Sequence, residues 1–272
     1  MNDGFERFCQ FLQNQSGIVL GAEQRYLVSA KLGTLLREHG IDNLHDLLEQ
    51  LEKHPFGRLR EQVIDAMCIH ETLWFRDGHP FEALKEHLLP ARLAEARHAP
   101  LRIWSAAAAS GQEPYSIAMS IDEFERSQSG LFRSGTEIIA SELSTRMLAV
   151  CQRGEYDALA IRRGLSAERL ARYFKPIDES HWRVLPAIRQ RVTFRLQNLL
   201  DSYAMLGQFD IIFCRNVLIY FSQAIRESII KRLHERLKPS GYLLLGATES
   251  LGGLGDYFQT VRCKQSIVYQ AK

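Results

Sequence analysis

The sequence predicts an α/β protein in which an all-helical N-terminal domain precedes a mostly parallel β-sheet. Three observations support this fold class. The opening part of the chain carries apolar side chains at helical spacing. From residue 101 onward, short apolar runs alternate with helical segments, which is the pattern of a parallel sheet with crossover helices. A loop of small residues, 105–111, follows the first of these runs, as expected where a strand ends at a ligand site.

Residues 1–75 form the predicted N-terminal helical domain. A helix at the start of the chain is followed by a second over 23–39, which stops at Gly40, a residue suited to a helix C-terminus. A third helix covers 44–51, and a fourth places an apolar stripe along 59–68. We interpret this stripe as core and not as a cofactor site.

The second helix is basic, because Arg25, Lys31 and Arg37 lie along it. An ordinary solvated face explains such a pattern, and a binding surface for an acidic partner is the alternative.

Residues 76–99 are charged and helical, with Pro80 and Pro90 as interruptions, and we interpret them as a linker helix. The sheet domain is then predicted to span 100–272. Its strand-like runs are 101–104, 136–140, 191–196, 209–213, 242–245 and 266–270. The last two runs lie close together with glycines between them, which favours an antiparallel final pair. The polar, basic stretch 156–190 interrupts the alternation, and we interpret it as an inserted subdomain.

The composition excludes several classes of function. A formal net charge of +2 gives no dominant basic field, so we expect no nucleic-acid partner. No apolar run approaches the roughly 18 residues of a membrane span, and the N-terminus has no apolar signal core. We therefore expect a cytoplasmic protein that does not insert into membranes. The five cysteines are scattered and join no histidine cluster, so we expect no metal site and no disulfide framework.

The loop 105–111 and the helix that follows it indicate a ligand site. Small side chains let a ligand approach the backbone, and Pro114 suits a helix start. Glu113 adds a carboxylate at this point. Such a loop suits a nucleoside ligand whose charged group is not a phosphate.

Polar residues also end the neighbouring strands. Glu142 follows the run 136–140, where an acid commonly accepts the two hydroxyl groups of a ribose; a helix N-cap near Ser144 is the alternative. Arg215 and Asn216 follow the run 209–213, at the sheet edge where such proteins bind ligands.

Each of these polar residues offers a definite interaction. Arg215 can pair with a carboxylate, although an Arg that only caps the sheet edge remains the alternative. Tyr220 lies one helical turn further on, and Asn198 is able to hydrogen-bond an adenine edge. The two aromatic residues in 71–77 have two alternative interpretations: they cover an active site, or they pack between the two domains.

Taken together, these segments resemble the CheR family, the glutamate methyltransferases of bacterial chemoreceptors. The resemblance keeps its order over nearly the whole chain. The segments that carry it are 72–76 with Phe81, 104–119, 140–144 with 154–156, 198–199, 209–221, 237–242 and 246–251.

The resemblance implies a Rossmann-like methyltransferase sheet that binds S-adenosylmethionine, contains a small β-subdomain near 156–190, and follows an all-α domain that recognises the receptor. It implies a protein-glutamate O-methyltransferase of chemotactic adaptation. The enzyme would convert glutamates on the cytoplasmic helices of membrane chemoreceptors into γ-methyl esters and release S-adenosylhomocysteine. The implied cofactor contacts are Thr72, Arg76, Glu113, Glu142, Asn198, Leu199, Arg215 and Asn216.

We expect Arg215 and Tyr220 to be catalytic, because they line the place where the substrate carboxylate enters. The implied receptor-binding residues are Arg25, Lys31 and Arg37, and we expect a monomer. Two different functions remain open: a methyltransferase for another acceptor, such as a small carboxylic acid or RNA, and a cofactor sensor or docking module without turnover.

Several features depart from the family pattern, among them two single positions and one loop. His70 stands where enteric relatives carry Asn, and Glu142 stands where Asp is common. The loop 175–181 is short and lacks glycine, which favours an enzyme that works without a receptor's C-terminal tether peptide.

Overall fold

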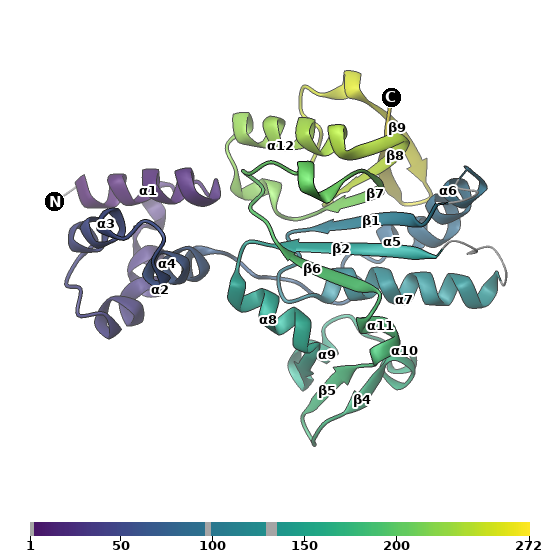
Figure 1. The fold of residues 1–272 in the computed structure, drawn as a ribbon, viewed down its shortest axis with the longest axis horizontal. Helices are drawn as coiled ribbons and strands as arrows, with labels where there is room; N and C mark the ends of the chain where they lie inside the picture. The colour runs from purple at the N-terminus through teal and green to yellow at the C-terminus, as the bar shows by residue number, and fades with distance from the viewer. Residues whose placement is uncertain (1–2, 96–98, 129–134) are drawn as a thin grey trace.

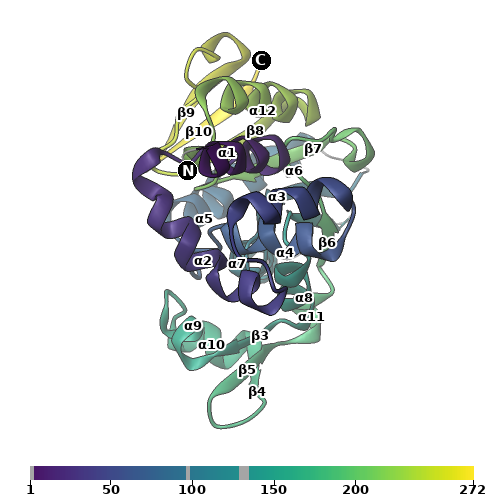
Figure 2. The same cartoon turned by 90° about the vertical axis from the view of Figure 1, so that its left-hand side faces the viewer.

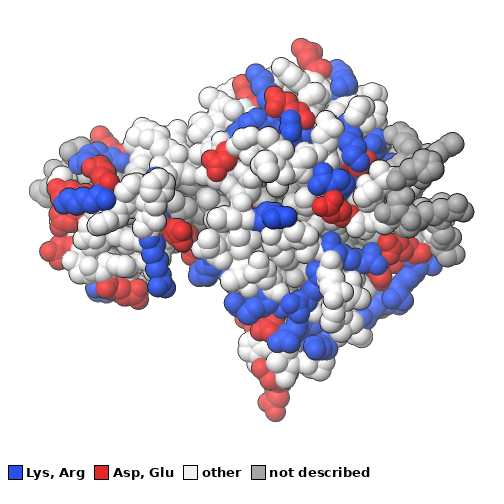
Figure 3. Space-filling view, viewed as in Figure 1, with Lys and Arg blue, Asp and Glu red and all other residues white. Residues whose placement is uncertain are grey.

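The computed structural model describes residues 3–95, 99–128 and 135–272 (Figure 1). A helical domain lies at one end of the molecule, and a β-sheet covered by helices makes up most of the rest. Within the described ranges, no helix combines the length and apolar character that crossing a membrane requires. On the face shown in Figure 3, basic and acidic side chains are interspersed over both domains, in keeping with the net charge of +2.

The predicted all-helical N-terminal domain is confirmed. Its helices are α1 (Asp3–Ser16), α2 (Arg25–Glu38), α3 (Leu44–Lys53) and α4 (Arg58–Met67), with a 3₁₀ turn η1 (Ala22–Gln24) before α2. Their apolar faces meet in one core that includes Phe8, Leu12, Leu32 and Leu51. The Asn43 side chain begins α3 by accepting two backbone N–H groups of its first turn.

The region interpreted as a linker helix, 76–99, is helical from residue 79, and its residues 96–98 lie outside the described chain. α5 (His79–Ala83), a π-turn η2 (Leu84–Leu88) and α6 (Leu89–Glu95) follow one another directly. Phe81, Leu84 and Leu88 are buried in the core beneath the sheet. This helical segment therefore covers the sheet instead of only connecting two domains.

The sheet has seven described strands in the order β6-β2-β1-β7-β8-β10-β9. They are β1 (Leu101–Ala106), β2 (Thr136–Glu142), β6 (Val192–Leu196), β7 (Phe209–Cys214), β8 (Leu237–Leu245), β9 (Phe258–Cys263) and β10 (Ser266–Ala271). The first five in this order pair in parallel, and β10 is antiparallel to both β8 and β9. The predicted antiparallel final pair is confirmed. β9 was not predicted, because this edge strand exposes Gln259, Thr260 and Arg262 and shows no apolar run.

Helices cover both faces of the sheet. Ile103 of β1 packs in the same core as Ile117 of α7 (Gln112–Ser127), whereas its neighbour Trp104 packs in the core of Ile229 from α12 (Gln223–Arg236). This alternation follows from the period of two in a β-strand. The chain order reverses between β1 and β7, so the carboxyl ends of these strands form the crevice where open α/β sheets bind ligands.

The predicted inserted β-subdomain is present and projects from the sheet domain (Figures 1 and 2). It follows α8 (Thr145–Arg153), and its three antiparallel strands lie in the order β3-β5-β4. Its elements are β3 (Glu155–Asp157), α9 (Ala158–Arg162), α10 (Ala167–Tyr173), β4 (Phe174–Pro176), β5 (His181–Val184) and α11 (Pro186–Arg189). Three 3₁₀ turns complete the chain: η3 (Ala204–Leu206), η4 (Leu218–Tyr220) and η5 (Gly255–Tyr257).

Candidate active site

A pocket opens at the carboxyl ends of β1, β2 and β7 and is closed on one side by the helical domain. The structure brings together all the residues predicted to bind the cofactor or to meet the substrate carboxylate. The pocket is lined by Thr72, Arg76, Glu113, Glu142, Asn198, Leu199, Arg215, Asn216 and Tyr220. His70 and Gln197 line it as well, and the helical domain adds Ser16 and Ile18. No local motif pointed to Ser16 or Ile18, because only the docking of the two domains places them there.

The loop after β1 is bent tightly enough to expose its backbone to the pocket. Ala107, Ala109 and Gly111 have φ values of 61°, 48° and 97°. Left-handed backbone is uncommon outside glycine, so this loop is fixed by its neighbours. The N–H of Ala108 donates to the Ser141 carbonyl (2.9 Å), and that of Ala109 donates to a Glu142 carboxylate oxygen (2.8 Å). The small side chains leave room for a ligand against this backbone.

Glu142 is buried, and both of its carboxylate oxygens accept backbone hydrogen bonds. Oε1 accepts from the N–H groups of Leu143 (2.9 Å) and Ser144 (3.0 Å), and Oε2 accepts from Ala109. Burial raises the pKa of this carboxyl group. The predicted alternative, a helix N-cap, is provided by Ser144. Its hydroxyl accepts the N–H of Met147 at the start of α8. Glu142 is therefore free to offer its remaining lone pairs to the pocket.

Glu113 lies in the first turn of α7 and is fixed by two donors. Its Oε1 accepts from the Ser105 hydroxyl (2.8 Å), and its Oε2 accepts from Nη1 of Arg215 (3.0 Å). Burial raises the pKa of Glu113 by more than the adjacent Arg215 lowers it. A cation bound in the pocket would stabilise the charge of this desolvated carboxylate.

Arg215 at the end of β7 is already paired in this structure. Its side chain is 1% exposed, and besides Glu113 it contacts Asp77, where Nη2 donates to Oδ2 at 2.7 Å. Nη2 also donates to the Arg76 carbonyl (3.0 Å), while the buried Nε finds no partner within the described chain. Arg215 was expected to bind a substrate carboxylate, but in the structure it pairs with two carboxylates of the protein itself. Asp77 was not among the residues predicted for this site.

Asn198 lies in the pocket wall, but its amide already serves the protein. Nδ2 donates to the carbonyl of Gln15 in α1 (2.7 Å), and Oδ1 accepts the N–H of Leu200 (3.0 Å). One N–H and one lone pair are left for an adenine edge. Asn198 therefore also ties the helical domain to the sheet domain.

A buried acid that the sequence did not single out shapes the loop carrying Asn216 and Tyr220. Oε2 of Glu249 accepts the backbone N–H groups of Asn216 and Gly246, each at 2.7 Å, and Oε1 accepts that of Ile219 (3.3 Å). Asn216 adopts a φ of 58° here. Tyr220 follows in η4, and burial raises the pKa of its phenol.

The segment between α4 and α5 supplies the last wall of the pocket. Thr72 and Arg76 both line it, and Nη1 of Arg76 donates to the Glu71 carbonyl (3.1 Å). Burial lowers the pKa of His70, whose Nε2 lies 3.9 Å from an oxygen of Asp65. The departure from Asn at position 70 therefore places a neutral imidazole in the pocket at neutral pH.

The three basic residues of α2 lie outside this pocket and do not share one face. Their spacing of six residues rotates each by roughly 120° from the next. Nζ of Lys31 donates to the carbonyl of Cys68 (3.0 Å), just beyond the last turn of α4, and desolvation lowers its pKa. Arg25 lies over the Phe5 ring (4.5 Å), and Arg37 contacts Thr34 (3.1 Å). Arg25 and Arg37 are exposed, whereas Lys31 is partly buried, so the three residues do not form one basic face.

Comparisons with known proteins cover nearly all of the chain. The family model "CheR methyltransferase, all-alpha domain" matches residues 3–68, and "CheR methyltransferase, SAM binding domain" matches residues 70–267. Chemotaxis protein methyltransferase Cher2 of Pseudomonas putida is 55% identical over 271 residues, which cover 100% of this chain and 98% of the relative. Chemotaxis protein methyltransferase 1 of Pseudomonas aeruginosa is 52% identical with the same coverage.

Among solved structures, the N-methyltransferase NodS from Bradyrhizobium japonicum WM9 in complex with S-adenosyl-L-homocysteine aligns at 13% identity and a TM-score of 0.40. The alignment covers 83% of this chain and 98% of NodS. The all-alpha model covers the helical domain described above, and the SAM-binding model covers the sheet domain. The chain therefore belongs to the CheR methyltransferase family, and S-adenosylmethionine is its cofactor.

Proposed function

We propose that this enzyme transfers a methyl group from S-adenosylmethionine to glutamate side chains on the cytoplasmic helices of membrane chemoreceptors. The products are glutamyl γ-methyl esters and S-adenosylhomocysteine, and the reaction serves chemotactic adaptation in the cytoplasm. One observation carries the proposal: two carboxylates, the partly buried Glu113 and the buried Glu142, line a pocket together with Arg215 and Tyr220 at the crevice of the sheet. The names of the relatives, chemotaxis protein methyltransferases, support the choice of partner.

The residues present suit a nucleoside that carries an amino acid side chain. Glu113 is a desolvated carboxylate and is proposed to bind the cofactor's ammonium group. Glu142 has unused lone pairs beside a loop of exposed backbone and is proposed to accept the ribose hydroxyls. Asn198, Leu199, Thr72 and Asn216 are proposed to complete the walls, as the resemblance implies.

The chain does not need to supply a general base. A glutamate side chain has an ordinary pKa of about 4.3, so the acceptor is already ionised at neutral pH. S-adenosylmethionine, when bound, supplies an electrophilic methyl group on a sulfonium. The protein then contributes orientation, which is worth roughly 7–11 kcal/mol in well-aligned reactions, and the exclusion of water from a site where opposite charges meet.

Arg215 is proposed to act on the reaction through its partners. By pairing with both Glu113 and Asp77, it fixes the acid that meets the cofactor and the turn that carries Arg76. Arg76 and the Tyr220 phenol both line the pocket and are proposed to orient the incoming substrate carboxylate. The proposed catalytic role of Tyr220 thus stays as predicted, while that of Arg215 becomes one of positioning.

An assay with labelled cofactor tests the proposed function. The enzyme is incubated with S-adenosylmethionine carrying a labelled methyl group and with membranes enriched in chemoreceptors. We expect base-labile label on a receptor, since carboxyl methyl esters hydrolyse in mild base. Label on RNA or a small carboxylic acid would favour another acceptor, and the absence of any label with intact S-adenosylhomocysteine binding would favour a sensor without turnover.

A further inference from the structure

A turn of uncommon backbone geometry carries Arg76 to the pocket. Phe75, Asp77 and Gly78 have φ values of 49°, 68° and 63°. Left-handed backbone is rare for a bulky aromatic residue and persists only where surrounding contacts offset its free-energy cost. Whatever fixes Phe75 therefore also fixes Arg76, which follows it directly, and Asp77, the partner of Arg215.

Contacts from three other elements fix Phe75. Its backbone N–H donates to the Ser116 hydroxyl (3.1 Å), and the edge of its ring meets Phe81 with the centroids 5.2 Å apart. The third contact is a guanidinium: Cζ of Arg169 lies 3.6 Å from the centre of the Phe75 ring. A cation stacked this closely on an aromatic face is a favourable electrostatic contact.

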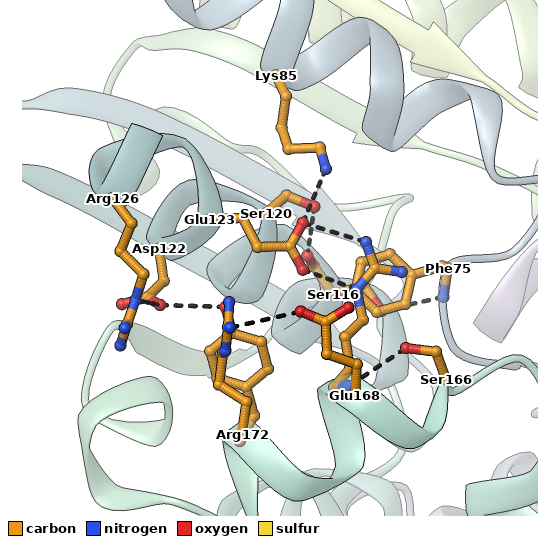
Figure 4. A network of polar contacts seen from close by, with 12 residues as sticks. Phe75, Lys85, Ser116, Ser120, Asp122, Glu123, Arg126, Ser166, Glu168 and Arg172 are labelled. Carbon is orange, nitrogen blue, oxygen red and sulfur yellow. Dashed lines mark hydrogen bonds and ion pairs between the residues drawn. The ribbon is translucent and has the colours of Figure 1, made fainter. Parts of the chain in front are cut away.

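Arg169 reaches Phe75 from the inserted subdomain, because it belongs to α10. Two hydrogen bonds to Glu123 of α7 orient its guanidinium: Nε donates to Oε1 at 2.7 Å, and Nη2 donates to Oε2 at 3.1 Å. Lys85 of the π-turn pairs with the same carboxylate (2.7 Å). Figure 4 shows Phe75, Ser116, Glu123 and Lys85 within this network. Such a planar, two-point pairing leaves the guanidinium little freedom to rotate away from the ring.

The same subdomain contacts the turn at its other end. The N–H of Trp74 donates to the Arg163 carbonyl (3.0 Å), and the Trp74 ring meets Tyr156 and Phe174 edge to face. At Gly164, a Cβ atom would lie only 2.2 Å from the Trp74 carbonyl oxygen. The turn and the inserted subdomain are therefore packed as one unit.

We infer that Arg169 is a positioning residue for methyl transfer, which stacks on Phe75 and thereby fixes Arg76 and Asp77 at the cofactor pocket. The inserted subdomain then completes the frame of the active site, in addition to any contact that it makes with a substrate. This inference rests on the proposed function, since it gives Arg76 and Asp77 a role in that reaction.

The test compares Arg169→Ala and Arg169→Lys with the wild-type enzyme. Arg172→Ala is the matched control, because Arg172 lies on the same helix and pairs with Glu168 at the surface. The affinity for S-adenosylhomocysteine is measured by calorimetry, kcat and the KM for S-adenosylmethionine by methylation, and Tm by thermal unfolding. We expect Arg169→Ala to weaken cofactor affinity about tenfold and to raise this KM by a similar factor.

The two other variants behave differently if the inference holds. Lysine keeps the charge and reaches Glu123 but has no flat group to stack, so Arg169→Lys should restore Tm more than affinity. Arg172→Ala should change neither. A second route to the same turn is Ser116→Ala, which removes the acceptor of the Phe75 N–H and should also weaken affinity.

A merely structural role for Arg169 predicts a lowered Tm with wild-type affinity and KM, and that result would overturn the inference. If Arg169→Ala does not fold, wild-type affinity in both Arg169→Lys and Ser116→Ala would overturn it equally. Failure of the proposed function has another signature, because the wild-type enzyme itself would then leave receptors unlabelled.

Discussion

Glu142 is the residue whose loss should affect cofactor binding most directly. Glu142→Ala removes the proposed acceptor of both ribose hydroxyls, and hydrogen bonds to a charged acceptor are worth roughly 1.5–3 kcal/mol each. We expect at least about a tenfold loss of S-adenosylhomocysteine affinity by calorimetry. Glu142→Asp keeps a carboxylate at this position and should lose less. Near-native binding by Glu142→Ala would contradict the assigned role.

Glu113 should make cofactor binding depend on pH. Its ionised form is the one that pairs with an ammonium group, so affinity should fall as the pH drops through its pKa. Because burial raises that pKa, the fall should begin at a higher pH than for an ordinary glutamate. We expect S-adenosylhomocysteine affinity of the wild-type enzyme to decrease on acidification, beginning above the pH at which an ordinary glutamate is protonated, but to decrease much less in Glu113→Gln.

His70 also lines the pocket and gains a proton on acidification, so it requires its own control. The lowered pKa of His70 means that this imidazole gains its charge only as the pH falls below the ordinary histidine range. His70→Asn should therefore keep most of the wild-type pH dependence. If Glu113→Gln shows the full wild-type slope and His70→Asn does not, the dependence belongs to His70.

At the residue scale, the sequence predicted which side chains lie together at the pocket, but not which partners they contact within the protein. Glu113, Glu142 and Arg215 each follow a strand, and parallel strands bring their carboxyl ends to one edge. The ion pair between Arg215 and Asp77 joins positions 138 residues apart, and no spacing rule reports such a contact. The role of Arg215 therefore required the structure.

The basic residues of helix α2 have different roles. Lys31 donates to the carbonyl of Cys68, where α4 ends, so Lys31→Ala should lower the free energy of unfolding by about 0.5–1 kcal/mol. Arg37 is exposed, so Arg37→Ala should leave stability unchanged and slow receptor methylation at low salt only, if it steers an acidic partner. Denaturant unfolding and methylation rates over a range of salt concentrations check both. A methylation rate independent of salt would contradict steering.

The edge of the inserted sheet is unsuited to pairing with an added peptide strand. β4 is an edge strand of three residues, and Pro176 within it has no N–H to donate. The short loop 177–180 follows directly. We therefore expect no micromolar binding of a receptor's C-terminal tether peptide in a calorimetric titration, and equal methylation of receptors with and without that tether. Micromolar affinity for the peptide would contradict this expectation.

Elements were predictable where their apolar side chains form a run or recur at a regular spacing. Five of the six predicted strands lie in the sheet interior, and the sixth, β6, lies at one edge. The strand at the other edge, β9, exposes Gln259, Thr260 and Arg262 and was missed. The helical segment 79–95 has a charged sequence, yet its side chains Phe81, Leu84 and Leu88 are buried in the core. Composition alone could not distinguish a connecting helix from one that covers a sheet.

At the scale of the whole molecule, the helical domain packs against the sheet domain and completes the wall of the pocket. Ser16 and Ile18 form one wall, and the sequence does not show which loop of one domain meets which edge of the other. The N–H of Val19 donates to the Tyr220 carbonyl (3.0 Å), and Ile18 forms a β-bridge with Phe221. Cofactor binding should therefore depend on this interdomain contact.

Gly17 tests that dependence, because it lies in the contact with a φ of 78°, and a Cβ there would lie 2.8 Å from the Phe221 ring. Gly17→Ala should separate the domains locally and weaken S-adenosylhomocysteine affinity several-fold. Gly40→Ala is the matched control, since Gly40 has a similar φ of 62° and nothing within 4 Å of the added methyl group. Both variants incur backbone strain of roughly 1–2 kcal/mol, so both should lower Tm, but only Gly17→Ala should lose cofactor affinity. Equal affinities in the two variants would contradict the dependence of cofactor binding on this interdomain contact.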